Sequence, residues 1–127
     1  MKHLRAAAEA GDANSQFNLG VFYDNRLDDN GHTVRSNRTE AMKWLLRAAR
    51  QGLPRAQTRL AGLYADGSEA VGDHVKACAW YLRALGGLSG ADRAKAQSGY
   101  ERVSSRMVPA EIARAQRLAR AWKLKWS

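Results

Sequence analysis

The sequence contains few of the residues that cross-link or interrupt a fold. Its 127 residues include one cysteine, Cys78, and two prolines, Pro54 and Pro109. A single cysteine excludes an internal disulfide. Alanine, arginine and leucine are plentiful, and these side chains lose little conformational freedom in a helix. We therefore predict an all-α fold without internal cross-links.

Long apolar runs are also absent. No window approaches the roughly 18 apolar residues that span a bilayer, and the first residues lack the apolar core of a signal peptide. We predict no membrane span. The compartment stays open: cytoplasmic if the start is native, and periplasmic or secreted if a signal peptide was removed. The overall composition, 45% apolar and 26% charged, is typical of one folded domain over residues 1–127.

Acidic residues are outnumbered. The chain carries 21 Lys or Arg against 12 Asp or Glu, a net charge of +9. Residues 91–127 hold nine of the basic and three of the acidic residues, so the last third is the basic end. Such an excess favours acidic partners, although charge alone does not distinguish protein from nucleic acid or anionic lipid.

The sequence repeats itself. Residues 13–23 match residues 54–64 at a spacing of 41, and residues 41–48 match residues 77–84 at a spacing of 36. Residues 3–11 match residues 44–52, again at a spacing of 41. This pattern predicts helix pairs joined by loops of variable length. The expected units are a half unit (1–11), repeat 1 (13–52) with a long loop at 24–39, repeat 2 (54–87) and a degenerate C-terminal capping pair (91–125).

Helix ends and buried faces follow from the same pattern. Glycines able to adopt a left-handed conformation are expected to end helices at Gly11, at Gly52 and at Gly86 or Gly87. Apolar residues three and four apart predict the packed faces. The predicted core residues are Phe17, Leu19, Tyr23, Ala41, Trp44, Leu45, Ala48, Leu60, Leu63, Tyr64, Ala77, Cys78, Trp80, Tyr81 and Ala84, with Ile112, Ala115, Leu118, Ala119, Trp122 and Trp126 on one face of the last helix. Trp126 is expected either to pack on the last helix pair or to serve as an exposed anchor.

At these residues the chain resembles the Sel-1-like repeat family, which is related to the tetratricopeptide repeats. The second unit keeps Ala56, Gln57, Leu60, Tyr64, Gly67, Asp73, Lys76, Ala77, Trp80 and Ala84, and the first keeps Gln16, Leu19, Gly20, Tyr23, Ala41, Trp44, Ala48, Ala49 and Gly52. Departures are the insertion at 24–39, Ala61 in place of a usual glycine, and Glu69 in place of another. The resemblance implies a right-handed α/α superhelix of about seven helices, acting as a bacterial protein-interaction scaffold or adaptor.

The resemblance also implies a binding face. In tetratricopeptide-like units the first helix of each pair lines the concave side. The positions that this predicts are Asn14, Phe17, Val21, Asp24, Asn25, Arg55, Thr58, Asp66, Lys95, Ser98, Arg102 and Arg106. The groove would be basic toward its C-terminal end, which favours an acidic protein or peptide as partner. The alternative is that these charges are merely solvated surface residues.

No motif in the sequence predicts catalysis. The histidines His3, His32 and His74 have no further ligand at metal-binding spacing. The acidic run at 24–31 fails as a calcium loop because Arg26 and Leu27 interrupt its ligand positions. The glycines at 86–90 lack the strand and lysine of a phosphate loop. We therefore expect no catalytic residue, metal or cofactor.

Three further readings stay open. The protein could be an immunity protein or regulator that neutralises a partner enzyme. It could bind nucleic acid through its basic C-terminal helix, which is less favoured because no aromatic stacking platform is interleaved with the basic residues. Finally, the half unit could expose an apolar stripe around Leu4 and Ala8, which would permit self-association.

Overall fold

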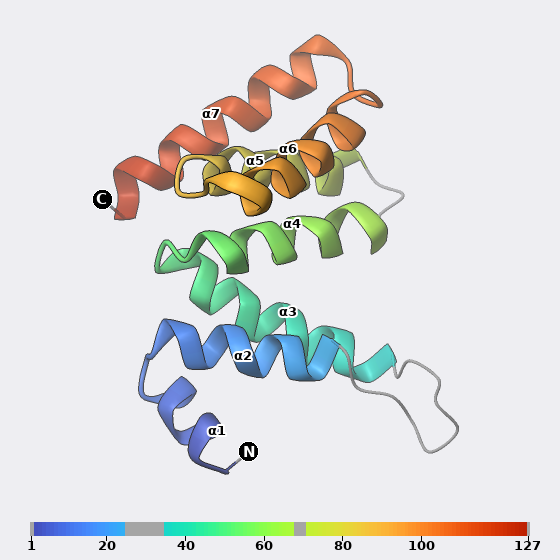
Figure 1. The fold of residues 1–127 in the computed structure, drawn as a ribbon. Helices are drawn as coiled ribbons and strands as arrows, with labels where there is room; N and C mark the ends of the chain where they lie inside the picture. The colour runs from blue at the N-terminus through green and yellow to red at the C-terminus, as the bar shows by residue number, and fades with distance from the viewer. Residues whose placement is uncertain (1, 25–34, 68–70, 127) are drawn as a thin grey trace.

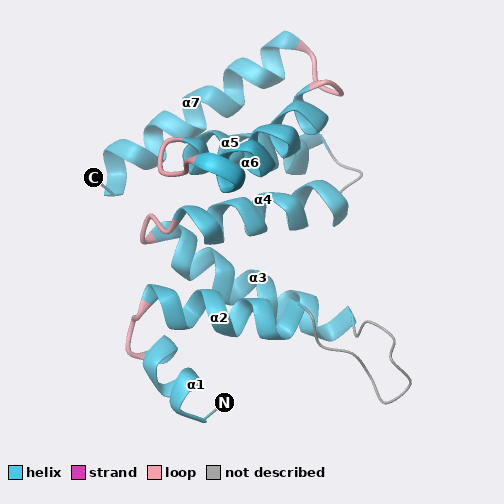
Figure 2. Ribbon diagram, viewed as in Figure 1, coloured by secondary structure: helices cyan, strands magenta, loops and turns pink. Residues whose placement is uncertain are grey.

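The computed structural model describes residues 2–24, 35–67 and 71–126, and the side chains of residues 2, 35–37, 67, 71, 72 and 122–126 lie outside the description. The described residues form seven helices and no strand (Figures 1 and 2). The helices are α1 (Lys2–Glu9), α2 (Ala13–Asp24), α3 (Arg35–Arg50), α4 (Pro54–Gly67), α5 (Val71–Leu85), α6 (Gly90–Ser104) and α7 (Pro109–Trp126).

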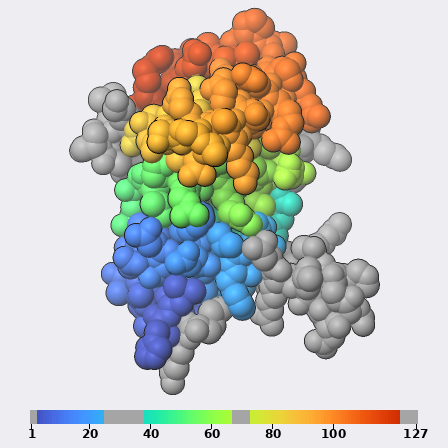
Figure 3. Space-filling model, viewed as in Figure 1, coloured from blue at the N-terminus to red at the C-terminus, as the bar shows by residue number. Residues whose placement is uncertain are grey.

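The helices stack in chain order. Each of α1 to α5 packs on the next, and α4 also touches α6. The space-filling view shows the result as successive bands from the N-terminal to the C-terminal helices (Figure 3). The final helix, α7, packs mainly on α5, so α5 holds the last two helices together. Repeated stacking of this kind builds a solenoid in which each unit contacts its neighbours.

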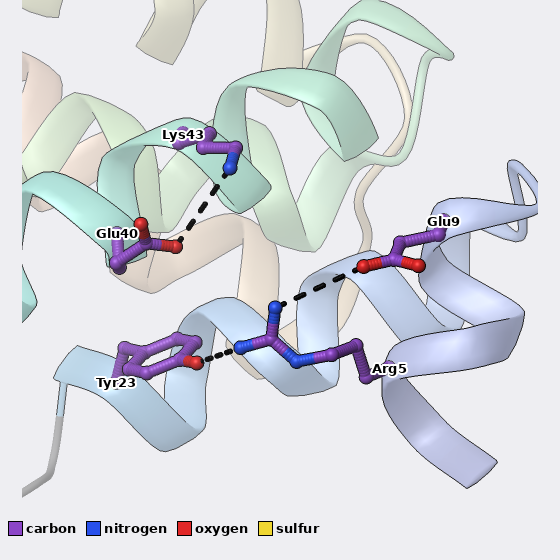
Figure 4. Close-up of polar contacts among 5 residues, drawn as sticks. All are labelled: Arg5, Glu9, Tyr23, Glu40 and Lys43. Atoms are coloured by element: carbon purple, nitrogen blue, oxygen red, sulfur yellow. Dashed lines mark hydrogen bonds and ion pairs between the residues drawn. The ribbon is translucent and has the colours of Figure 1, made fainter. Parts of the chain in front are cut away.

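The N-terminal half unit is covered, contrary to expectation. Ala8 is fully buried and Leu4 is partly buried against the cluster that Leu19 and Tyr23 form on α2. Arg5 donates a hydrogen bond to the Tyr23 hydroxyl and lies 3.8 Å from Glu9 (Figure 4). The expected exposed stripe at Leu4 and Ala8 was wrong, because α1 turns its small residues onto α2.

The first loop is shorter than the sequence suggested. Asp24 belongs to α2 and α3 begins at Arg35, so helix replaces both ends of the loop expected at 24–39. One stabilising contact comes from Arg38, which donates a hydrogen bond to the backbone carbonyl of Leu63 in α4. Asn25 and the rest of the acidic run at 24–31 lie outside the described residues.

Most of the predicted residues form the core, but Phe17, Leu63 and Tyr64 are only partly buried against it. Trp44 is 1% exposed and Trp80 is 2% exposed, which confirms both as core positions. Cys78 is fully buried, as predicted for a structural thiol, and burial raises its pKa to about 11. On α7, Ala115 is buried and Ile112 packs against the same cluster. The Trp126 side chain lies outside the description.

Glycine ends two of the helices as expected. Gly11 and Gly52 have φ of 108° and 93°, values that glycine adopts without steric cost. Helix α5 also ends where predicted, at Leu85 directly before Gly86, but neither Gly86 nor Gly87 adopts the expected left-handed conformation: the third positive φ, 59°, belongs to Gly90. Gly87 is small for another reason: a Cβ there would lie 2.5 Å from Cγ of Pro54.

A buried glutamine joins each unit to the helix before it. The Gln16 side chain donates a hydrogen bond to the Ala8 carbonyl (3.0 Å), and Gln57 donates equivalently to Ala49 (3.1 Å). Both glutamines are at most 4% exposed. Each of these carbonyls also accepts a backbone N–H, from Gly11 or Gly52, so the glutamine is a second donor at the C-terminal ends of α1 and α3. In the third unit, Gln97 instead donates to Glu101 on its own helix.

Removing the buried side-chain amide of the glutamine should lower the stability of the stacked helices. We expect Gln57→Leu to lower the free energy of unfolding by about 1–2 kcal/mol, because a buried hydrogen bond is lost. Gln97→Leu is the matched control and should change it by less than about 0.5 kcal/mol, since Gln97 bonds only at the surface. Urea unfolding followed by circular dichroism measures both. Equal losses would show that the buried bond contributes nothing specific.

Candidate functional site

A groove of about 480 Å³ runs along α2, α4 and α6. Helix α5 contributes to its floor and the turn after α5 to its rim. The lining residues are Phe17, Asp24, Arg55, Thr58, Arg59, Gly62, Leu63, Ala65, Asp66, His74, Tyr81, Leu88, Asp92, Lys95, Gly99, Arg102, Val103 and Arg106.

Eight of the twelve positions expected on the concave face line this groove: Phe17, Asp24, Arg55, Thr58, Asp66, Lys95, Arg102 and Arg106. Asn14 and Ser98 are exposed but lie outside it, and Val21 is partly buried and also outside it. Asn25 is not described. The structure therefore brings Arg55 of α4 onto one groove with Lys95, Arg102 and Arg106, which lie 40, 47 and 51 positions later in the sequence.

Two of the basic lining residues have intramolecular partners. The Arg59 guanidinium lies 2.9 Å from the Asp24 carboxylate, which links α4 to α2. Arg55 stacks its guanidinium over the Phe17 ring, 5.1 Å from the centroid. This cation–π contact covers the ring, so Phe17 offers little free aromatic surface to a ligand.

Three further basic side chains are available. Among the described residues, Lys95, Arg102 and Arg106 have no carboxylate within ion-pair distance, and all three are exposed. Lys95 and Arg102 belong to α6, and Arg106 lies in the turn that follows it. Two lining carboxylates, Asp66 and Asp92, oppose them. With Asp24 already paired, the remaining charge of the groove is positive.

A tyrosine lies at the floor of the groove. Tyr81 belongs to α5, is 5% exposed, and lines the groove between α4 and α6. A Cβ built on Gly62 would lie 3.6 Å from the Tyr81 hydroxyl, and one built on Gly99 would lie 2.6 Å from it. The hydroxyl is thus flanked by two positions without side chains. Burial raises the pKa of Tyr81, with Arg102 opposing and Asp66 reinforcing the shift, so the phenol keeps its proton at neutral pH.

Sequence reasoning missed several lining residues. Tyr81 was assigned to the packed face of α5, where its ring does lie, but its hydroxyl also reaches the groove. Arg59 and His74 were not predicted, nor were the two glycines. A glycine inside a helix is unfavourable by about 1 kcal/mol relative to alanine. Gly62 and Gly99 were therefore a signal in the sequence, and at Gly99 the cause is close approach, since a Cβ there would lie 2.5 Å from Cζ of Tyr81.

The described residues do not assemble a recognisable reaction centre. They contain no group of three or more His, Cys, Asp or Glu able to hold a metal ion. The one thiol has a raised pKa and therefore remains protonated at neutral pH, which makes it a poor nucleophile. None of the helices in the described ranges is long and apolar enough to cross a membrane. The basic groove is the feature of this surface that has a definable binding chemistry.

Stacked helix pairs with a groove along their first helices define an α-solenoid repeat protein. The profile of the Sel1 repeat family matches residues 13–53 and 54–85, which is more than half of the chain. The chain belongs to the Sel1 repeat family, as the sequence motifs predicted. No curated protein gave a significant match.

Two solved structures are similar to the chain. One is c5321, a protective antigen present in uropathogenic Escherichia coli strains that displays an SLR fold: 26% identity, TM-score 0.77, covering 97% of this chain. The chain spans 25% of the length of c5321. The other is a Sel1 repeat protein from Oxalobacter formigenes, at 31% identity and a TM-score of 0.50, covering 91% of this chain and 96% of that one. These likenesses confirm the predicted all-α superhelix and suggest a bacterial origin.

Repeat proteins of this kind generally mediate protein–protein interactions and are generally non-catalytic scaffolds. The partner of an individual member depends on the residues that it displays, because one fold supports many partners.

Proposed function

We propose that the chain is a protein-interaction module that holds an acidic segment of a partner protein in the groove along α2, α4 and α6. The observation that carries this proposal is the excess of positive charge: five Lys or Arg side chains line the groove against three aspartates. Three of the five have no carboxylate partner within the described residues. A partner that supplies carboxylates would form ion pairs with these three side chains.

The groove favours a peptide over a nucleic acid. Base recognition by single-strand binders relies on free aromatic faces for stacking. Here the Phe17 ring lies under the Arg55 guanidinium, and the Tyr81 ring is buried under Gly99. Carboxylate recognition instead relies on guanidinium groups, which Arg102 and Arg106 provide. An extended acidic segment therefore fits the lining better than stacked bases.

A direct binding test uses two peptides that differ only in charge. We expect a fluorescein-labelled, amidated glutamate octapeptide to bind in an anisotropy titration, and the matching glutamine octapeptide not to bind. The affinity should fall steeply as salt rises, because the contacts are charge pairs at a solvent-exposed surface. Binding of both peptides alike would contradict an electrostatic groove.

A single-stranded oligonucleotide of equal charge is the third probe. We expect it to bind more weakly than the glutamate peptide near physiological salt. Tighter binding of the oligonucleotide would overturn the proposal in favour of a nucleic-acid partner. The narrower idea that the partner is an enzyme neutralised by this protein is tested by co-purification with the product of a neighbouring gene.

A further inference from the structure

The floor of the groove carries a polar group without a partner among the described residues, the hydroxyl of Tyr81. Tyr81 is 95% buried, yet its hydroxyl makes no hydrogen bond with any described residue. Its oxygen is not among the buried unpartnered side-chain atoms of the described residues, which are the Trp44 indole nitrogen and Arg83 Nε, so the hydroxyl is the part of Tyr81 that stays accessible. Because the groove reaches Tyr81, this hydroxyl is open to a partner from outside.

The two neighbouring helices leave access to that hydroxyl. Gly62 on α4 and Gly99 on α6 flank it, and neither carries a side chain that would cover it. Their small size has different causes. Gly99 is required by packing, since a Cβ would lie 2.5 Å from Cζ of Tyr81. Gly62 is not required by packing, since a Cβ would lie 3.6 Å from the hydroxyl, an ordinary contact. The gap at Gly62 therefore has no structural explanation of its own.

Positive charge lies beside the gap. Arg102 is close enough to the Tyr81 hydroxyl to affect it electrostatically, and it lines the groove together with Arg106. Asp66 also lines the groove and contributes negative charge near the hydroxyl. The neutral phenol can donate a hydrogen bond and the guanidinium only donates, so one carboxylate can accept from both. Their natural ligand is a carboxylate.

We propose that the Tyr81 hydroxyl and Arg102 form a subsite for one carboxylate side chain, Asp or Glu, of the bound segment, which enters through the gap at Gly62. This inference rests on the proposed function and specifies it: the segment has one carboxylate that is buried between α4 and α6, and further acidic residues that stay at the rim with Lys95 and Arg106.

Two variants test the subsite with the amidated glutamate octapeptide, which carries no terminal carboxylate. Tyr81→Phe keeps the packed ring and removes only the hydroxyl, and we expect about a tenfold loss of affinity. Gly62→Ala covers the hydroxyl with a methyl group, and we expect a similar loss together with an unchanged or higher Tm, because alanine favours the helix. A purely structural role for Gly62 predicts a lower Tm instead.

Tyr64→Phe is the matched control, because Tyr64 is a half-buried phenol outside the groove lining. It should leave the affinity within twofold. If Tyr81→Phe and Gly62→Ala also stay within twofold, the subsite is wrong. The proposed function would still stand in that case, provided that reversing the charges of Arg102 and Arg106 abolishes binding.

Discussion

Reversing two charges at the C-terminal end of the groove, Arg102→Glu with Arg106→Glu, is expected to lower the affinity for the glutamate octapeptide by about a hundredfold or more. Hydrogen bonds to charged groups contribute roughly 1.5–3 kcal/mol each, and the new carboxylates also repel the ligand. The anisotropy titration measures the loss. Helicity and Tm should stay unchanged, because both side chains are exposed and have no ion-pair partner among the described residues.

The matched control reverses two arginines of the last helix, Arg114→Glu with Arg117→Glu. Both side chains are exposed on α7 and lie outside the groove, so the net charge changes equally while the lining does not. We expect this variant to keep most of the affinity, apart from a small long-range effect. Equal losses in the two double variants would show that net charge, and not the groove, determines binding.

Removing the tryptophan of the first unit, Trp44→Ala, should lower the free energy of unfolding by about 3–5 kcal/mol, the usual cost of deleting a buried aromatic side chain. Trp44 is 1% exposed and packs with Ala8, Leu19, Tyr23 and Ala41. This cluster is small, so no other large side chain can fill the space. Urea unfolding followed by circular dichroism measures the change, and hydrogen exchange should show the loss mainly in α1 to α3.

Trp44→Phe separates packing from polarity. The indole N–H of Trp44 is buried and has no hydrogen-bond partner in the described part of the chain. Phenylalanine keeps a ring in the cluster and removes that unsatisfied donor, so it should cost clearly less than alanine. A loss below about 1 kcal/mol for Trp44→Ala would contradict the assignment of this residue to the core.

The fold was predictable from the sequence because the same residue types recur at equivalent positions of successive repeats. Tryptophans at positions 44 and 80 and glutamines at positions 16 and 57 recur at helix-pair spacing, and each pair has the same role in the structure. The prediction failed where a residue depends on its neighbours in space. Ala8 is buried because α1 lies on α2, and Gly87 is small because Pro54 lies beside it. Neither neighbour is evident from local sequence.

The candidate site was predictable in part for the same reason. The family pattern places the first helices on one face, and eight of the twelve residues chosen from it line one groove. Tyr81 could not be assigned from periodicity, because its ring packs in the core while its hydroxyl ends in the groove. A long side chain can pack its ring in the core and place its polar end at the surface, whereas a pattern of buried and exposed positions assigns each residue to only one of the two.

We propose that the groove along α2, α4 and α6 binds an acidic segment, and the backbone amide signals of the glycines that line it test this binding directly. In a ¹⁵N NMR titration with the glutamate octapeptide, the amide signals of Gly62 and Gly99 should shift in a saturable manner, because both residues line the groove. The signals of Gly11 and Gly52, at the helix-ending turns, should not shift. Saturable shifts confined to α7, with Gly62 and Gly99 unaffected, would contradict the account.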